Sequence, residues 1–142
     1  MVKRTIAAIA GAAALTAALS LAGAGTASAA TGGDHLNKGD SMYAGDDIHN
    51  PAGTKLIFQA DGNLVEYRYD GRVCWATGTN GHGGTRVTYQ NDGNFVMYAG
   101  ADDSHPVWAS NTSGWFDKGL NVNINARGEV WVGNNQLTNA CE

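Results

Sequence analysis

The sequence predicts an all-β domain built from three related units, and three observations carry this prediction. The segment 54–67 (TKLIFQADGNLVEY) recurs at 85–98 (TRVTYQNDGNFVMY), with the same offset of 31 residues throughout. A second match links 75–81 (WATGTNG) to 108–114 (WASNTSG). Within these segments apolar and polar side chains alternate with a period of two, which is typical of strands with two distinct faces. Nothing after residue 30 shows a helical period, and Gly and Asn interrupt the chain every few residues.

Each unit is expected to begin with a hairpin. In the first two units Asp-Gly-Asn, at 61–63 and 92–94, separates two alternating runs and is a strong turn signal. A third, eroded copy spans 120–132 and keeps the alternation and a glycine. One face of all three hairpins is apolar and should point into a common core. Its residues are Leu56, Phe58 and Leu64, then Val87, Tyr89 and Phe95, then Val122, Ile124 and Val130.

Tryptophans follow the first two hairpins and are expected to complete the centre of the domain. Trp75 and Trp108 occupy matching places in their units. Trp131 could take this role in the third unit, although it falls at a different place in the repeat. Three units of roughly four short strands therefore predict a pseudo-threefold domain.

Residues 1–30 are expected to be a signal peptide rather than part of the fold. Lys3 and Arg4 precede a long Ala-rich apolar stretch, and 27–29 (ASA) form a small-x-small cleavage site. This short basic start is typical of bacterial export, and cleavage near Ala29 or Ala30 would release a secreted protein. The alternative is a retained membrane helix, but the stretch is only weakly hydrophobic and a processing site follows it. No later segment is apolar enough to span a membrane.

Removing the leader sharpens the charge of the chain. The whole sequence carries 13 acids and 9 bases, and residues 31–142 keep all 13 acids but only 7 bases, a net charge of −6. Such an acidic chain argues against a nucleic-acid or anionic-membrane binder, which needs a basic surface. Its length suits a single domain over 31–142 and excludes a multi-domain enzyme.

The two cysteines, Cys74 and Cys141, are expected to form a disulfide. An exported chain with an even number of cysteines favours a bridge, and only one intrachain pairing exists. Two free thiols or an intermolecular bridge are the alternatives. Two cysteines without a CxxC spacing make a poor metal site, so no metal or other cofactor is expected.

The polar face of the hairpins is the candidate binding site. A solvated face would favour Lys, Glu and Thr, whereas these rows combine amides, a carboxylate, a phenol and one aliphatic side chain. Sugars need this combination, because each hydroxyl both donates and accepts while the C–H surface needs an apolar contact. The candidate residues are Gln59, Asp61, Asn63, Val65 and Tyr67 in the first unit and Gln90, Asp92, Asn94, Val96 and Tyr98 in the second.

The pattern Gln-x-Asp-x-Asn-x-Val-x-Tyr, present twice and each time followed by Trp-Ala-Thr/Ser-x-Thr, resembles the signature of bulb-type (monocot, snowdrop-like) mannose-binding lectins. The resemblance covers about residues 36–139. It implies a β-prism II fold of three four-stranded antiparallel sheets around a pseudo-threefold axis. It also implies that Asp61 and Asn63 hold O2 of mannose, Gln59 holds O3, Tyr67 holds O4 and Val65 packs on the C3–C4 edge, with the same roles in the second unit.

The third unit departs from this signature at every position and is not expected to bind mannose in the family's mode. Asn125, Arg127, Glu129, Trp131 and Gly133 stand where Gln, Asp, Asn, Val and Tyr would be required. The cysteine spacing also differs from the bridge associated with the plant members, so their oligomer geometry is not carried over. A homo-oligomer nevertheless remains an open expectation.

The sequence favours a binding protein over an enzyme. Asp61 and Asp92 occupy the same place in separate repeats, which puts them on different sheets, too far apart for a glycosidase pair that needs about 5–9.5 Å. No G-x-S-x-G motif appears, and the four histidines show no ligand spacing. Two alternatives to a mannose-binding lectin remain: a lectin-like bacteriocin acting on a competitor's envelope, and a protein-interaction module whose sugar sites are relics.

Overall fold

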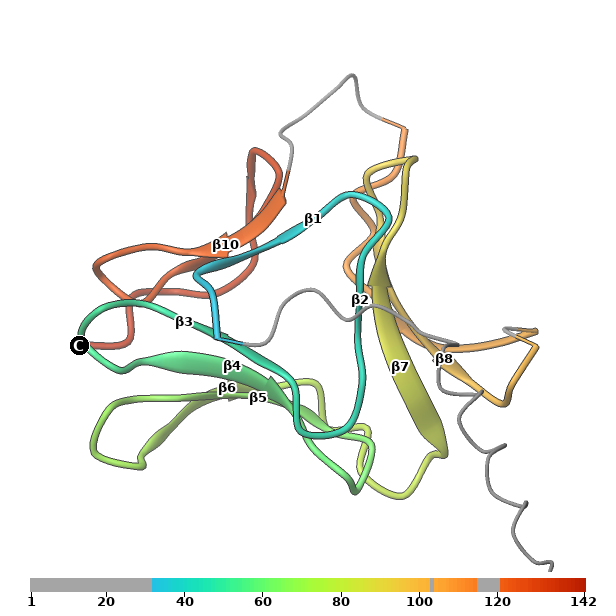
Figure 1. Cartoon of the computed structure of the whole chain (residues 1–142), viewed down its shortest axis with the longest axis horizontal. Coiled ribbons are helices and arrows are strands. Elements are labelled where there is room, and N and C mark those ends of the chain that lie inside the picture. The colour runs from blue at the N-terminus through green and yellow to red at the C-terminus, as the bar shows by residue number, and fades with distance from the viewer. Residues whose placement is uncertain (1–31, 103, 115–120) are drawn as a thin grey trace, which may run out of the picture.

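The computed structural model describes residues 32–102, 104–114 and 121–142, and this part of the chain forms strands joined by turns, without helices (Figure 1). The proposed signal peptide and its cleavage site lie outside the described residues. Within the described residues no helix is long and apolar enough to cross a membrane. The strands are β1 (His35–Asn37), β2 (Ser41–Met42), β3 (Asp47–His49), β4 (Lys55–Phe58), β5 (Leu64–Tyr67), β6 (Val73–Ala76), β7 (Gly84–Tyr89), β8 (Phe95–Ala99), β9 (His105–Ala109), β10 (Asn121–Ile124), β11 (Val130–Val132) and β12 (Asn135–Gln136).

Three four-stranded antiparallel sheets form the three sides of a prism (Figure 1). We name each sheet after the copy of the repeat that it contains. The first sheet has the order β3-β4-β5-β6, the second β2-β7-β8-β9 and the third β1-β10-β11-β12. The predicted all-β fold with pseudo-threefold symmetry is confirmed.

The fourth strand of each sheet does not come from its own repeat. Instead, the N-terminal segment 35–49 passes along all three sheets in turn and gives one short edge strand to each. β1 pairs with β10 of the third sheet, β2 with β7 of the second and β3 with β4 of the first. One short segment therefore ties the three units together, an arrangement that the repeat by itself does not reveal.

The core lies on the prism axis, where the three apolar faces meet. All nine residues predicted to share this core are buried, with exposed fractions of 0–3%. Leu36, Met42 and Ile48 add one apolar residue from each of the three N-terminal strands. The central strands also contribute Met97 and Val132, whose counterpart in the first sheet is Glu66.

The tryptophan prediction holds for two units and is wrong for the third. Trp75 and Trp108 pack against the core and meet edge to face, with ring centroids 5.8 Å apart. Trp131 instead pairs with Asn123 and Gln136 on the outward-facing side of the third sheet, half-buried. Leu137 is the residue of the third unit that packs against the core from this edge.

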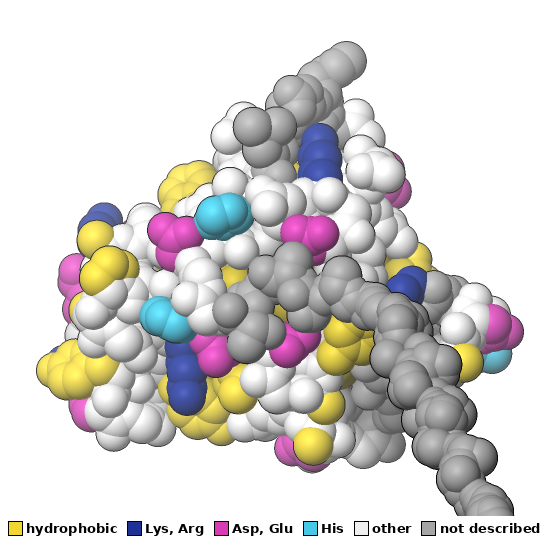
Figure 2. All heavy atoms as spheres, in the orientation of Figure 1, with side chains coloured by type: hydrophobic (Ala, Val, Ile, Leu, Met, Phe, Trp, Pro, Cys, Tyr) yellow, Lys and Arg dark blue, Asp and Glu magenta, His cyan; other side chains and the backbone are white. Residues whose placement is uncertain are grey.

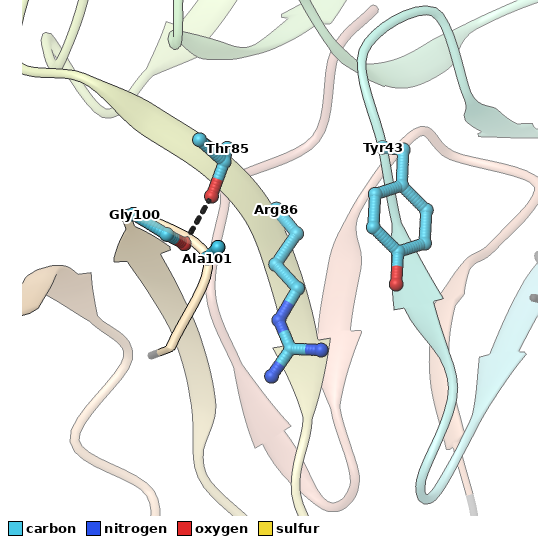
Figure 3. Close-up of a pocket in the computed structure, with 5 residues that line it drawn as sticks. All are labelled: Tyr43, Thr85, Arg86, Gly100 and Ala101. Atoms are coloured by element: carbon cyan, nitrogen blue, oxygen red, sulfur yellow. Dashed lines mark hydrogen bonds between the residues drawn. The ribbon is translucent and has the colours of Figure 1, made fainter. Parts of the chain in front are cut away.

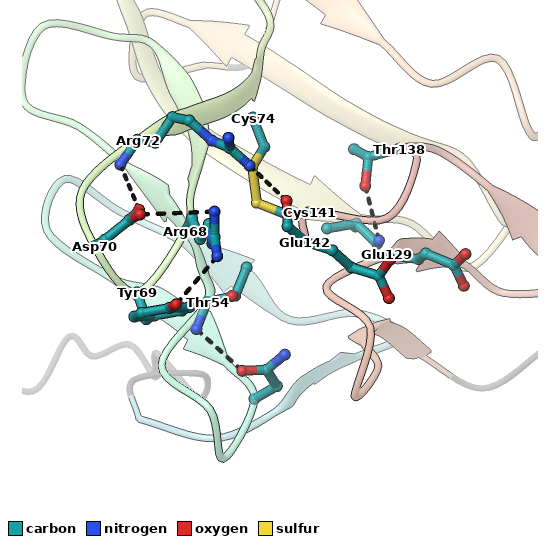
Figure 4. The surroundings of a disulfide bond; sticks show 12 residues. Thr54, Arg68, Tyr69, Asp70, Arg72, Cys74, Glu129, Thr138, Cys141 and Glu142 are labelled. Atoms are coloured by element: carbon teal, nitrogen blue, oxygen red, sulfur yellow. Dashed lines mark hydrogen bonds and ion pairs between the residues drawn. A yellow bond between two sulfur atoms is a disulfide. The ribbon is translucent and has the colours of Figure 1, made fainter.

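The disulfide prediction is confirmed as an intrachain bridge between Cys74 and Cys141, whose Cα atoms lie 5.7 Å apart. It joins β6 of the first sheet to the C-terminal end of the chain (Figure 4). Beside it the Arg72 guanidinium donates a hydrogen bond to the backbone carbonyl of Glu142, at 2.6 Å. The bridge therefore anchors the C-terminal segment beside the turn between β5 and β6 of the first sheet.

Candidate functional site

The ten candidate residues lie in two equivalent rows on the outward-facing sides of the first and second sheets. In the first sheet Lys55 pairs with Tyr67 and Ile57 with Val65, so these four side chains share one face. In the second sheet Arg86 pairs with Tyr98 and Thr88 with Val96. The structure thus brings the five predicted residues of each unit together and keeps the two units apart.

A glutamine and a tyrosine form one end of each row. Gln59 Nε2 donates a hydrogen bond to the Tyr67 hydroxyl oxygen at 2.6 Å, and Gln90 Nε2 makes the equivalent bond to Tyr98. Because each phenol oxygen accepts this bond, its own O–H proton is directed elsewhere. The amide oxygen of each glutamine makes no hydrogen bond within the described residues.

The aspartate at the other end holds the turn in shape. Asp61 Oδ1 accepts a hydrogen bond from the backbone N–H of Asn63 at 3.0 Å, and Asp92 makes the same contact with Asn94 at 2.9 Å. These are Asx turns, in which the aspartate side chain fixes the backbone of the residue two positions after it. Asp61 and Asp92 are themselves exposed, and their second carboxylate oxygens keep their accepting capacity.

The asparagines hold the hairpin turns against the next strand. Asn63 Oδ1 accepts hydrogen bonds from the Thr77 hydroxyl at 2.9 Å and from the backbone N–H groups of Gly78 at 2.9 Å and Thr79 at 3.1 Å. Asn94 Oδ1 accepts from Ser110 and Thr112 in the same way. The sequence signal for this support is the repeated Thr/Ser-x-Thr after Trp-Ala, which in the sequence alone stands only as a repeated match and as part of the family resemblance.

After these internal bonds each row retains a defined set of polar groups. The aspartate offers an acceptor, the asparagine an N–H₂ donor, the glutamine an acceptor and the tyrosine an O–H donor. Two donors and two acceptors, fixed by internal hydrogen bonds, suit a ligand whose neighbouring groups each donate and accept. Vicinal hydroxyls have this property. A misplaced hydroxyl would leave one of these groups unpaired, at a cost of about 1–3 kcal/mol.

The valines form the floor of each row. Val65 and Val96 are each only 3% exposed. Their apolar contact with a ligand is therefore small, and the polar groups around them carry most of the recognition.

A hollow adjoins the row of the first sheet, with a volume of about 430 Å³. Gln59 and Tyr67 of the row line it, together with Lys55, Ile57 and Tyr69. The second sheet has a smaller hollow of about 350 Å³ between Tyr43, Arg86 and Gly100, and neither Gln90 nor Tyr98 lines it (Figure 3). The first hollow runs beside the row from Gln59 and past Tyr67, whereas the second is lined by residues such as Arg86 and Gly100 at the far side of Tyr98 from the turn.

The third sheet uses its polar groups on one another. Asn125 Nδ2 donates to Glu129 Oε2 at 2.7 Å, and this hydrogen bond, followed by the charge of Arg127, lowers the pKa of Glu129. Arg127 also forms ion pairs with Glu129 at 3.3 Å and with Glu142 at 3.5 Å. These mutual contacts replace the retained donors and acceptors of the other two sheets.

A metal site or a basic patch would require charged groups outside the two rows to gather. In the described ranges no cluster of three or more His, Cys, Asp or Glu side chains could hold a metal ion. On the face shown in Figure 2, the Lys and Arg side chains are separated from one another and do not merge into a basic patch.

A three-sided prism that carries duplicated polar rows beside small apolar floors defines a class of carbohydrate-binding proteins, the β-prism lectins. Solved structures of this class are similar to the chain. A monomeric monocot mannose-binding lectin from Gastrodia elata is 34% identical, with a TM-score of 0.60, covering 75% of this chain and 92% of that one. The mannose-specific agglutinin of snowdrop (Galanthus nivalis), complexed with methyl-α-D-mannoside, is 31% identical, with a TM-score of 0.60 and coverages of 69% and 86%.

A third similar structure is the Polygonatum cyrtonema lectin in complex with a monomannoside, at 27% identity, with a TM-score of 0.58 and coverages of 69% and 86%. No protein-family model matches the sequence, and no curated protein is similar enough to it to count as a match. The Gastrodia and snowdrop lectins, however, are more than 30% identical to the chain and are covered over most of their length. The chain therefore belongs to the bulb-type mannose-binding lectin family. It is a carbohydrate-binding domain and not an enzyme.

Proposed function

We propose that the protein is a secreted lectin that binds mannose, or glycans containing it, at two sites on the first and second sheets. Gln59, Asp61, Asn63, Val65 and Tyr67 form the first site. Their counterparts Gln90, Asp92, Asn94, Val96 and Tyr98 form the second, and the third sheet does not bind mannose.

One observation carries this proposal. The retained donors and acceptors are the same in both rows, although the surrounding residues differ. Lys55 and Ile57 in the first sheet correspond to Arg86 and Thr88 in the second. A pattern that served only to hold the hairpins would need the asparagines and aspartates, but not the glutamine–tyrosine pairs. Two similar structures contain a bound mannoside, in the snowdrop and Polygonatum proteins, which supports mannose as the ligand.

Calorimetric titration with methyl-α-mannoside tests the proposal. Wild-type protein should bind two equivalents per chain, each weakly, because a shallow site buries little of the sugar. Asp61→Ala and Asp92→Ala should each remove one equivalent, and the double variant should bind none. Arg127→Ala, at the equivalent position of the third sheet, is the matched control and should leave both equivalents. Normal binding by the double variant would refute the site assignment.

The proposal includes export of the protein with removal of residues 1–30. The basic start, the apolar stretch and the small-x-small site of residues 1–30 are the features of a cleaved leader. The intrachain disulfide supports an oxidising destination, since such bridges persist outside the reducing cytosol. The intact mass of protein recovered from the medium should correspond to a chain that starts at residue 30 or 31. A mass that includes Met1 would contradict the proposed export and cleavage.

A further inference from the structure

We propose that the first site is longer than the second and takes two linked sugar residues. Mannose would lie over the row from Asp61 to Tyr67, and the next residue of the glycan would lie in the adjoining hollow between Lys55, Ile57 and Tyr69. The inference rests on the proposed function, since it assigns a second subsite to the same glycan.

The hollow continues the row without a break. Gln59 and Tyr67, which are hydrogen-bonded to each other, belong both to the row and to the lining of the hollow. The turn residues at the other end of the row do not line it, so the hollow lies beside Ile57 on β4 and extends past Tyr67. Its volume of about 430 Å³ lies within the range of roughly 300–1,000 Å³ typical of small-molecule sites. A ligand that occupies the row therefore has room to continue past Tyr67.

An exposed and well-held aromatic ring forms one wall of this hollow. Tyr69 is 62% exposed. The Arg68 guanidinium lies 4.8 Å from the ring centroid, donates a hydrogen bond to the Tyr69 hydroxyl at 3.0 Å, and forms an ion pair with Asp70 at 3.7 Å (Figure 4). A ring fixed in this way offers contact area at a low cost in conformational entropy. Together with the half-buried Ile57, it provides the apolar surface that the C–H groups of a sugar need.

Lys55 supplies polar recognition in the same hollow. It lies directly opposite Tyr67 on the neighbouring strand and is exposed. Its ammonium group forms no ion pair or hydrogen bond with the described residues. Two acids on flanking segments of the same sheet have partners of their own, since Asp47 contacts His49 at 2.9 Å and Asp70 contacts Arg68. Three N–H donors thus remain for hydroxyl oxygens of the second residue.

Among the residues that the structure describes, the second sheet lacks this subsite. At the matching positions it has Thr88 in place of Ile57 and Gly100 in place of Tyr69. The aromatic ring in its hollow is Tyr43, which lies on the other side of Arg86 from Gly100 (Figure 3). Since neither Gln90 nor Tyr98 lines that hollow, it does not continue the row. The two sites should therefore differ in their preference for disaccharides over monosaccharides.

The experiment measures this preference at one site at a time. Asp92→Ala leaves only the first site and Asp61→Ala only the second. Each protein is titrated with methyl-α-mannoside and with the α1-2, α1-3 and α1-6 linked methyl mannobiosides. At the first site the best mannobioside should bind about 3- to 10-fold more tightly than the monosaccharide, the gain expected from one aromatic contact. At the second site the ratio should stay below twofold.

Variants then assign the preference to the hollow. In the Asp92→Ala protein, Tyr69→Gly and Ile57→Thr introduce the residues of the second sheet, and each should reduce the ratio toward one. Tyr43→Ala in the same protein is the control and should leave the ratio unchanged. Equal ratios at the two sites, or an undiminished ratio in both hollow variants, would overturn the inference while monosaccharide binding still supported the proposed function. Absence of monosaccharide binding would instead refute the proposed function and the inference with it.

Discussion

Replacing Glu66 with glutamine should change the free energy of unfolding in a pH-dependent way. Relative to the wild type, the variant should be more stable at pH 8 than it is at pH 4. Glu66 lies on β5 between Leu56 and Trp75 and has an exposed fraction of 0%. Both of its carboxylate oxygens are buried without a hydrogen bond to a described residue. Met97 and Val132 occupy the matching positions of the other sheets, so Glu66 is an acid in a core position.

The magnitude follows from the pKa. Burial raises the pKa of Glu66 from 4.5 to about 7, and the nearby Thr138 hydroxyl only partly opposes this. Well below pH 4.5 the side chain is protonated in both the folded and the unfolded chain, and no penalty arises. As the pH rises from 4.5 to 7 the unfolded chain loses this proton first, so the folded state loses stability. Above pH 7 the loss levels off at about 3 kcal/mol.

Urea unfolding followed by tryptophan fluorescence measures this effect between pH 4 and pH 8. Other groups titrate in this range, so the informative quantity is the difference in unfolding free energy between Glu66→Gln and the wild type. This difference should grow with pH by up to about 3 kcal/mol in favour of the variant. Glu142→Gln, an exposed acid, is the control and should show no such growth. Parallel profiles for Glu66→Gln and the wild type would refute the reasoning.

Three further predictions concern stability. Replacing Cys74 and Cys141 with alanine should cost about 4 kcal/mol of unfolding free energy, because the bridge closes a separation of 67 residues; urea titration with and without reductant checks this, and an unchanged midpoint would contradict it. Asn63→Ala should lower the free energy of unfolding by about 2–4 kcal/mol, and by more than Asp61→Ala, because it leaves three hydrogen-bond donors without their acceptor rather than one. Thermal melting measures both losses, and equal melting temperatures for the two variants would contradict the prediction. Gly128→Ala should cost at least about 1–2 kcal/mol, because its φ is +74° and a Cβ would lie 2.9 Å from Cβ of Cys141; thermal melting measures this loss, and wild-type stability would contradict it.

The core was predictable because it depends on local alternation. A residue such as Phe58 or Phe95 has the same parity and the same neighbours in each copy, so the period of two alone places it inward. The origin of the edge strands was not predictable in this way. β1, β2 and β3 have only two or three residues each, too few to show a period, and the partners of β1 and β2 lie in repeats far along the chain.

The site was predictable in its composition but not in its internal bonding. The register of the two repeats placed the polar residues in rows. The amide oxygen of Asn63, however, accepts hydrogen bonds from Thr77, Gly78 and Thr79, which follow directly after β6. The hollow beside Tyr67 likewise depends on Tyr69, which lies just beyond the repeated segment. Glu66 has the same register in the alternation as the core residue Leu64, so its inward position could have been predicted. Its full burial could not, because an acid at such a position is usually exposed.

The most direct test of the two-site account is a map of amide and side-chain NMR shifts during titration with methyl-α-mannoside. Two separate groups of signals should shift, one around Asp61 and Tyr67 and one around Asp92 and Tyr98. Signals around Trp131 on the third sheet should not move. Shifts confined to the third sheet, or no shift at either predicted row at saturating mannoside, would contradict it.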